Sequence, residues 1–393
     1  MVNRGTFLIA LLLATSLAAG CSIGPQVIRG SRTRYNAAVQ MTASEEMLLN
    51  LVRARYGDPP EFLAVSGITT QFEVGSKIGF GDEFGLGDPR VAGSLTTADR
   101  PTISMTPLQD EQFTRRFLSP IQLDTIYLFS RNGRKVERVL RLVVENVNGL
   151  QNGPVTTDAS PGAFVWMART LDDLAKRQQV ELGHREATEE VSPPLKPDAV
   201  AGADVVAAME KGYRFRAAED ESVVLTGRTR ELMLRISPQA QGSPEIEGLT
   251  GLLQLTPGRM SYALKQATEG QLTAVGPREE LRVSTRSVEE ILHFLCQQVV
   301  VPCCHIERGL IAAHEGSPDG SLSAAADLLT IHSSKSRPRH AVVAVHHRDH
   351  WFFIDDADAS SKETFELLLE LYNLEIRGGG AASIPFLTLP VGR

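Results

Sequence analysis

The sequence lacks the short motifs that mark the common hydrolases and nucleotide-binding enzymes. It contains no GxSxG, HExxH, Walker-type phosphate loop or GxGxxG. These absences argue against the enzyme classes that depend on such motifs, although a catalytic triad assembled from distant residues leaves no local signature. The sequence therefore indicates no catalytic residue and no cofactor, and it favours a protein that is not an enzyme.

Basic charge and long apolar runs are also scarce. The chain has 40 Lys and Arg against 47 Asp and Glu, which gives a net charge of −7 at pH 7. This mild acidity argues against a nucleic-acid partner, because binding the phosphate backbone requires a basic patch or stripe. No apolar run reaches the roughly 20 residues that a membrane-spanning helix needs.

The first twenty residues have the features of a secretory signal peptide. A basic residue, Arg4, precedes a short apolar run at 7–14, and small residues follow at 18–20. A positive start, a short apolar middle and small residues before the cleavage site are the three parts of such a signal. We therefore expect the mature chain to begin at Cys21.

The residues before Cys21 resemble the lipobox of bacterial lipoproteins. The lipobox prefers Leu three residues before the cysteine, where this chain has Ala18, with Leu17 one position earlier. The resemblance implies a diacylglycerol on the Cys21 sulfur, cleavage before it and acylation of the new N-terminus. Two or more acyl chains anchor a protein stably, so the membrane is an expected partner. Ser22 favours the outer membrane, and both of its faces stay open. An ordinary secretory signal with an incidental cysteine is the alternative.

Helix-like and strand-like segments are mixed along the chain without an internal repeat, which predicts an α+β fold. The stretch EATEEVSPPLKPDAVAGAD is charged and rich in proline and alanine, as linkers are. We therefore expect two mixed α+β domains. The predicted segments are a signal peptide at 1–20, a lipidated tether at 21–40, an N-terminal domain at 41–185, a linker at 186–204 and a C-terminal domain at 205–393.

Local patterns predict several individual elements. A helix is expected over TASEEMLLNLVRARY, with Ser44 as its N-cap, and a strand over VERVLRLVVENVNG. The stretch HAVVAVHHRDHWFFIDD predicts a hairpin that turns at Arg348–Asp349. The helix that follows has Ser360 and Glu363 at the spacing of a capping box, and IPFLTLPVGR is the predicted last strand.

An unusual alternation of residue types runs through 72–86. Apolar side chains recur at even positions, which is the period of a β-strand. The apolar residues are Phe72, Val74, Ile78, Phe80, Phe84 and Leu86. The stretch GDP at 87–89 can turn the chain, and the residues after it can return. The sequence therefore predicts a long β-hairpin arm at about 70–106, available to a membrane or a protein partner.

The arm also allows a hypothesis of a shared membrane pore. A membrane-spanning β-strand needs only about 9–11 residues with alternating faces. Closing the arms of several chains into one barrel would pair their exposed edges. Glycine-rich odd positions, Asp82, Asp99 and a polar return limb make a poor lipid face. A homo-oligomeric outer-membrane pore or export component is therefore the alternative to a binding or scaffold module.

Three cysteines follow the predicted lipidation site, namely Cys296, Cys303 and Cys304. Outside the cytoplasm a disulfide can form. Adjacent cysteines rarely bridge, so Cys296 is the expected partner of Cys303 or Cys304, with one thiol left over. The surrounding stretch HFLCQQVVVPCCH also offers soft ligands for zinc or copper, although its spacing matches no closed zinc finger.

All nine histidines lie between His184 and His350, and the densest group is HHRDH. Together with a nearby aspartate this group offers a candidate metal site, whose residues are His346, His347, His350 and Asp355. A catalytic zinc site requires three converging ligands and one open position. The competing interpretation is a polar hairpin turn followed by a helix cap, which needs no metal.

Several blocks of the chain jointly resemble a family of uncharacterised bacterial lipoproteins. The blocks are RYNAAVQMTASEEMLLNLVRARYGDPPEFL, RPTISMTPLQDEQFTRRFLSPI, VVENVNGLQNG, WFFIDDADASSKETFELLLELYNLE and LTLPVGR. The family has no assigned activity, so the resemblance implies a lipoprotein without implying a catalytic residue. We expect an outer-membrane-anchored binding or scaffold module of the cell envelope. The alternatives are the pore and a metal-dependent envelope hydrolase.

Overall fold

The computed structural model describes residues 23–81, 90–153, 162–196, 200–218, 222–267, 276–311, 325 and 327–377. Helices and strands are mixed throughout these ranges, which confirms the predicted α+β class. Cys21, Phe84, Leu86 and the expected strand IPFLTLPVGR lie outside the described residues. None of the described helices is both long and apolar enough to span a membrane.

The chain enters the fold through a long helix, α2 (Ile23–Arg55). Most of the expected tether at 21–40 is therefore helical. Ser44 lies inside this helix, where its hydroxyl donates to the carbonyl of Gln40 at 3.1 Å, so it is not the predicted N-cap. The apolar residues of the last turns are buried in the body, and they are Met47, Leu48, Leu51 and Val52.

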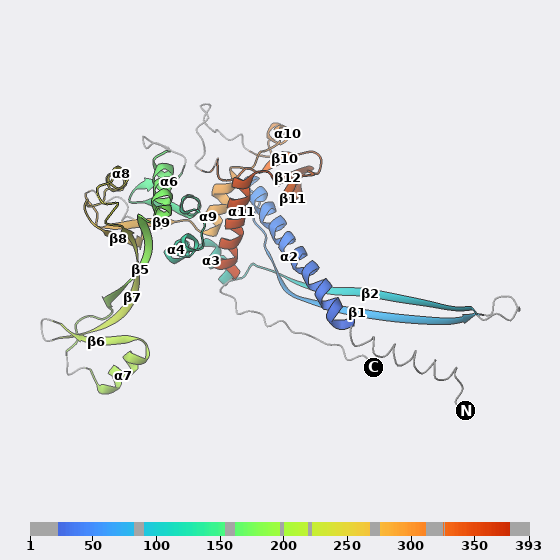
Figure 1. Cartoon of the computed structure of the whole chain (residues 1–393), viewed down its shortest axis with the longest axis horizontal. Coiled ribbons are helices and arrows are strands. Elements are labelled where there is room, and N and C mark those ends of the chain that lie inside the picture. Colours follow the sequence, from blue (N-terminus) through green and yellow to red (C-terminus); the bar gives the residue numbers. More distant parts are fainter. Residues whose placement is uncertain are drawn as a thin grey trace.

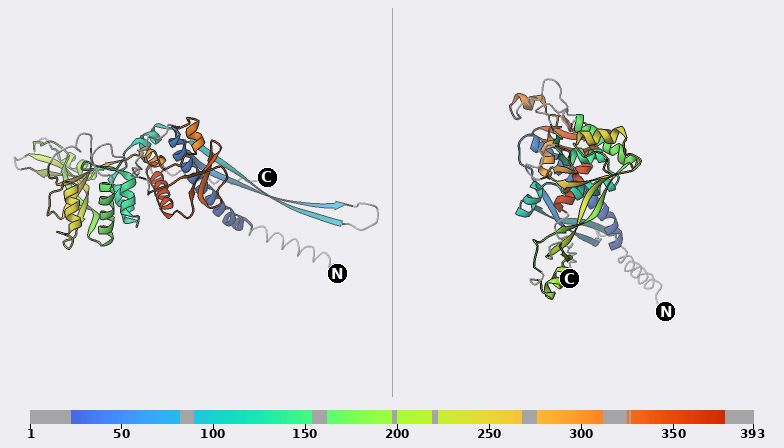
Figure 2. Two further views of the ribbon diagram at one scale, coloured as in Figure 1. Left: turned by 90° about the horizontal axis from the view of Figure 1, so that it is seen from above. Right: turned by 90° about the vertical axis from the view of Figure 1, so that its left-hand side faces the viewer.

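The predicted arm consists of β1 (Leu63–Gly81) and β2 (Arg90–Pro107), which pair antiparallel. The register places Phe72 opposite Asp99 and Phe80 opposite Val91. Among the strands that the structure describes, β1 and β2 pair only with each other. The ribbon projects from the body on the same side as the N-terminal end of α2 (Figures 1 and 2).

One part of the body is a seven-stranded sheet. Its strands are β3 (Val144–Val147), β4 (Leu150–Gln151), β5 (Val180–Glu190), β6 (Tyr213–Ala217), β7 (Val223–Ile236), β8 (Ser261–Gln266) and β9 (Glu280–Thr285). Their order is β4-β3-β9-β8-β7-β5, with β6 paired to β7, and the β8–β9 pair is parallel. The helices near this sheet are α4 (Leu123–Arg131), α5 (Val136–Val143), α6 (Gly162–Lys176) and α8 (Pro244–Leu252) (Figure 1).

The expected strand VERVLRLVVENVNG is a strand only in its second half. Its first half is α5, in which Val139, Leu142 and Val143 are completely buried. Residues three and four positions apart share one face of a helix, so this spacing suits a helix packed on a core. Successive Val and Leu residues concealed that period in the sequence.

The other part of the body packs a three-stranded sheet on helices. The strands are β10 (His332–Ser334), β11 (Ala341–His347) and β12 (His350–Asp355). The helices of this part are α3 (Glu111–Leu118), α9 (Val288–Cys296), α10 (Cys303–Glu307), α11 (Ala359–Tyr372) and the π-helical η2 (Asn373–Arg377). The helix α7 (Gly202–Glu210) lies beside β6 of the seven-stranded sheet (Figure 1).

The hairpin between β11 and β12 turns where the sequence predicts. Arg348 and Asp349 both have positive φ, 47° and 64°, as the two central residues of a type I′ turn require. The helix α11 also forms, but its N-cap is Asp358, which accepts a hydrogen bond from the Ser361 amide at 3.0 Å. The predicted capping box of Ser360 and Glu363 is therefore wrong by two residues.

The two predicted domains share one sheet and one core. In the seven-stranded sheet, β4 and β3 of the first half lie at one edge and β5 at the other, with β9, β8 and β7 of the second half between them. The expected linker at 186–204 begins inside β5, since Glu186 to Glu190 pair with β7. The charge and proline content of 186–204 belong to the end of the edge strand β5 and to the segment that follows it. Strand β5 thus crosses the boundary predicted at residue 186.

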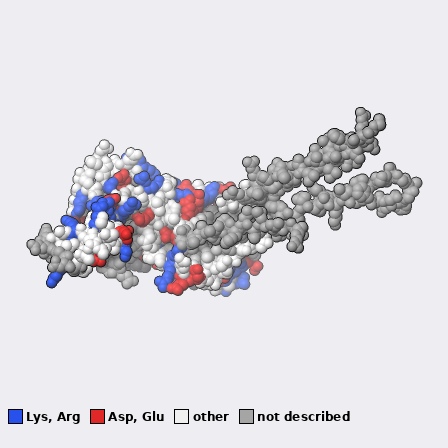
Figure 3. Space-filling model, turned by 90° about the horizontal axis from the view of Figure 1, so that it is seen from below, with Lys and Arg blue, Asp and Glu red and all other residues white. Residues whose placement is uncertain are grey.

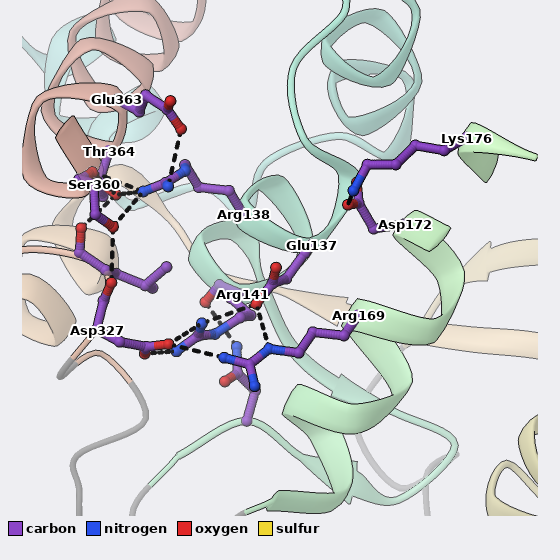
Figure 4. A network of polar contacts seen from close by, with 12 residues as sticks. Glu137, Arg138, Arg141, Arg169, Asp172, Lys176, Asp327, Ser360, Glu363 and Thr364 are labelled. Atoms are coloured by element: carbon purple, nitrogen blue, oxygen red, sulfur yellow. Dashed lines mark hydrogen bonds and ion pairs between the residues drawn. The ribbon is translucent and has the colours of Figure 1, made fainter. Parts of the chain in front are cut away.

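A polar network also joins the halves (Figure 4). Arg138 of α5 donates to the Ser360 carbonyl at 2.8 Å and pairs with Glu363 of α11 at 3.0 Å. Arg141, one turn later, binds Asp327, whose second oxygen lies 3.1 Å from a guanidinium nitrogen of Arg169. On the face in Figure 3, basic and acidic side chains of the body lie interspersed.

Candidate functional site

Cysteine and histidine side chains gather where α10 meets the β11–β12 hairpin. Cys304 Sγ lies 3.9 Å from Nε2 of His350, and the His305 and His350 rings meet edge to face with centroids 4.7 Å apart. One donor atom from each of the three residues lies within 4.8 Å of the other two. We call Cys304, His305 and His350 the Cys–His cluster. It is the one such group of three or more metal-ligating side chains in the described part of the chain.

The backbone explains why these residues meet. The alternation of β12 puts His350 on the same buried face as Phe352 and Ile354, so the imidazole points into the body. The helix α10 starts directly after Pro302 and brings Cys304 and His305 toward that face. His305 is 1% exposed and His350 is 8% exposed, whereas Cys304 is half-buried.

Tyr56, just after α2, is in contact with the Cys–His cluster. Its hydroxyl lies 2.5 Å from Nδ1 of His305, and its ring packs edge-on against the His305 and His347 rings. Burial raises the pKa of Tyr56 to about 12, against the opposing charge of Arg348, whose guanidinium lies 4.8 Å from the ring centroid. The hydroxyl therefore stays neutral and available as a hydrogen-bonding partner.

Asp58 holds the hairpin turn beside Tyr56. Both of its carboxylate oxygens accept from one guanidinium nitrogen of Arg348, at 3.0 and 2.9 Å. His347 Nε2 lies 3.6 Å from the same carboxylate. Burial and the Arg348 charge lower the pKa of His347, although Asp58 acts in the opposite direction. The carboxylate is engaged with Arg348, so the charges of this pair compensate each other.

The electrostatics of the Cys–His cluster favour a neutral imidazole at His305. Burial lowers the pKa of His305, and the nearby charges of His350 and Arg308 lower it further, while a hydrogen bond to the Arg348 backbone opposes them. A neutral imidazole is the form that binds a metal ion or accepts a proton from a thiol. The arrangement can therefore serve as a ligand set or as a thiol–imidazole pair.

The metal site expected at His346, His347, His350 and Asp355 is not brought together. His346 is exposed and lies edge-on to Trp351, with ring centroids 5.3 Å apart. His347 faces Asp58, and Asp355 accepts from the Ala357 amide at 2.8 Å at the far end of β12. Because five residues of strand separate His350 from Asp355, their backbones lie about 16 Å apart. Of the four, His350 alone belongs to the Cys–His cluster.

The expected disulfide is also absent, since all three described cysteines are free thiols. Cys296 is buried in α9, where its thiol donates to the carbonyl of His293 at 3.1 Å, and burial raises its pKa to about 11. Cys303 is exposed and Cys304 points toward His350. The fold thus places the three sulfurs in different surroundings.

The sequence analysis treated the CCH and HHRDH motifs as separate groups and did not identify Tyr56 as a candidate site residue. Cys304 and His350 are 46 residues apart, and Tyr56 is 249 residues from His305. A contact at such separations leaves no periodicity or spacing in the sequence. Both motifs are rich in side chains that bind metals, Cys and His in one and His in the other. This shared property was the signal that could have linked the two motifs.

The predicted arm residues that the structure describes occupy alternate positions of β1. They are Phe72, Val74, Ile78 and Phe80, and they stand opposite Asp99, Thr97, Gly93 and Val91 of β2. The return strand thus presents small or polar residues at three of these four positions. This register agrees with the polar return limb that the sequence indicated.

Comparison with protein-family models, with curated proteins and with solved structures finds no match to this chain.

Proposed function

We propose that this chain is an outer-membrane-anchored lipoprotein that acts as a binding or scaffold module of the cell envelope, with the β1–β2 arm as its contact element. The observation that carries the proposal is the arm itself. It is a two-stranded ribbon that projects beside the N-terminal end of α2 (Figure 1). That helix begins at Ile23, two residues after the proposed lipidation site at Cys21.

The base of the arm is fixed to α2. The Asn50 side chain donates to the Glu61 carbonyl at 2.7 Å and accepts from the Glu61 amide at 2.9 Å. One turn earlier, the Glu46 carboxylate accepts from the Leu63 amide at 2.6 Å. These bonds set the direction in which the arm leaves the helix, and the arm projects on the side of the body where α2 begins (Figure 1).

The edges and the exposed apolar side chains of the arm favour binding of a protein partner. An isolated two-stranded ribbon is at best marginally stable in water, and no other strand in the described part of the chain covers either outer edge of β1–β2. Near its base, Ile103 is 46% exposed and Met105 is 55% exposed. A protein partner that adds a strand to either edge would satisfy the backbone groups and cover these apolar side chains.

The anchor is tested by fractionating cells that express the full chain or its Cys21→Ser variant. We expect the parent in the outer-membrane fraction with incorporated palmitate, and the variant in the soluble periplasmic fraction without it. An equal distribution of the two proteins would contradict lipid anchoring.

The arm is tested by thiol labelling of Thr97→Cys, which lies in β2 opposite Val74. We expect this thiol to react with a maleimide readily in the purified protein and much more slowly in intact envelopes. Cys303, which is exposed in the body, is the internal control and should react equally in both preparations. Labelling of the arm at the same rate in both preparations would overturn the proposal.

The pore remains a second candidate because the arm is long enough for it. The strands β1 and β2 have 19 and 18 residues, against the roughly 9–11 that a membrane-spanning strand needs. Two results would favour the pore over the scaffold. The first is a closed ring of several chains by light scattering in mild detergent. The second is protection of Thr97→Cys in vesicles that contain only lipid and this protein.

A further inference from the structure

We propose that Cys304, His305 and His350 bind a zinc ion, with the Cys304 thiolate and one nitrogen from each imidazole as ligands. The proposal concerns the body and is independent of the anchor and the arm. Three protein ligands leave one position of a tetrahedral zinc ion for water or a small ligand, which is the arrangement of zinc sites that act on substrates.

The distances are close to those that zinc requires. Bonds of about 2.3 Å to sulfur and 2.0 Å to nitrogen put the two donors about 3.6 Å apart in a tetrahedral site. Cys304 Sγ and His350 Nε2 are 3.9 Å apart, and all three donors fit within 4.8 Å. A contraction of a few tenths of an ångström brings this pair to the tetrahedral distance. Donors that lie up to 4.8 Å apart must approach by about 1.3 Å, through side-chain rotation.

Oxygen atoms are in place to orient both imidazoles. The Arg348 carbonyl lies 3.5 Å from Nδ1 of His350, so a proton on Nδ1 leaves Nε2 free to face Cys304. The Tyr56 hydroxyl holds Nδ1 of His305. Ligating histidines regularly bond their second nitrogen to a carbonyl, carboxylate or water, and this contact fixes the tautomer and the ring orientation.

The surrounding charges permit a cation here. The nearest guanidinium on the hairpin, that of Arg348, is bound by the Asp58 carboxylate at 2.9 Å. One thiolate and two imidazoles suit borderline and soft ions such as zinc, and not the hard, oxygen-seeking Mg²⁺ or Ca²⁺.

The test uses the untagged full chain in mild detergent, stripped with a chelator and then titrated with Zn²⁺ against a competing chromophoric chelator. We expect one zinc ion per chain. Titration with Co²⁺ should give the sulfur-to-metal charge-transfer absorption that only a thiolate ligand produces. Cys304→Ser should abolish that absorption and weaken zinc binding at least about tenfold, since even second-sphere changes cost 10–100-fold.

Cys303→Ser is the matched control, because it removes an exposed thiol from the adjacent residue and should leave both signals unchanged. Should Cys304→Ser fail to fold by circular dichroism, His350→Gln provides the same test of zinc affinity with the thiol retained. Zinc binding that survives both Cys304→Ser and His350→Gln, or that depends equally on Cys303, would overturn the site. A wild-type chain that binds no zinc would do so as well.

Discussion

Arg286 shows how a single side chain can organise a core. It is 6% exposed, and its guanidinium donates to the backbone carbonyls of Leu142 and Val144 at 3.1 and 3.0 Å, and also to those of Arg141 and Asn152. Burial lowers its pKa to about 10, so it remains charged at neutral pH. These bonds lock the junction between α5 and β3, where a helix passes directly into a strand.

Replacing Arg286 by Met should therefore lower the free energy of unfolding by about 3 kcal/mol, because a side chain of similar length leaves buried carbonyls without a donor. Urea denaturation followed by circular dichroism measures the loss. Arg185→Met is the control, since Arg185 is half-exposed on β5 and pairs with Glu231 at 2.6 Å. An exposed pair contributes less than about 1 kcal/mol. Equal losses in the two variants would contradict the role of the buried guanidinium.

At the scale of elements, the β11–β12 turn sets the position of the Cys–His cluster. The turn needs left-handed backbone at both central residues, and Asp349 has φ of 64° there. Glycine adopts this conformation without a steric penalty, whereas alanine does not. Arg348 at the preceding position is held by Asp58, so Asp349 is the turn residue that can be changed without loss of that ion pair.

We expect Asp349→Gly to raise the free energy of unfolding by about 0.5 kcal/mol, and Asp349→Ala to lower it by about 1 kcal/mol. The opposite signs separate backbone strain from loss of the carboxylate, which both variants share. Urea midpoints of the two variants against the parent provide the measurement. Two shifts of the same sign would mean that the carboxylate, and not the backbone, dominates at this turn.

Elements with a strong local signal were predictable from the sequence. The alternation at 72–80 predicted the arm, and the helical pattern after Asp358 predicted α11. Both predictions were possible because each pattern lies within one short stretch of neighbouring residues. The start of α2, the cap at Asp358 and the helix at 136–143 were missed because competing local patterns were equally good. The Cys–His cluster depends on a contact between Cys304 and His350 across the chain, which no local pattern encodes.

At the scale of the whole molecule, the halves of the sequence are interleaved. The strand β3 lies between β4 and β9, and β5 pairs with β7 along its full length. The C-terminal end of α2 packs on α9 and β11, more than 230 residues later. A strand whose neighbour is missing leaves a row of backbone groups unpaired and an apolar face uncovered.

We therefore expect a chain divided after residue 204 to fail as two separate proteins. Residues 21–204 and 205–393, expressed alone, should each lack a cooperative urea transition, because each fragment lacks strands and core residues that the other supplies. Co-expression of the two fragments should restore a stable complex with a single transition, which distinguishes an interleaved body from fragments that are merely aggregation-prone. Cooperative unfolding of residues 205–393 alone would instead support two independent domains and make the shared sheet a contact between them.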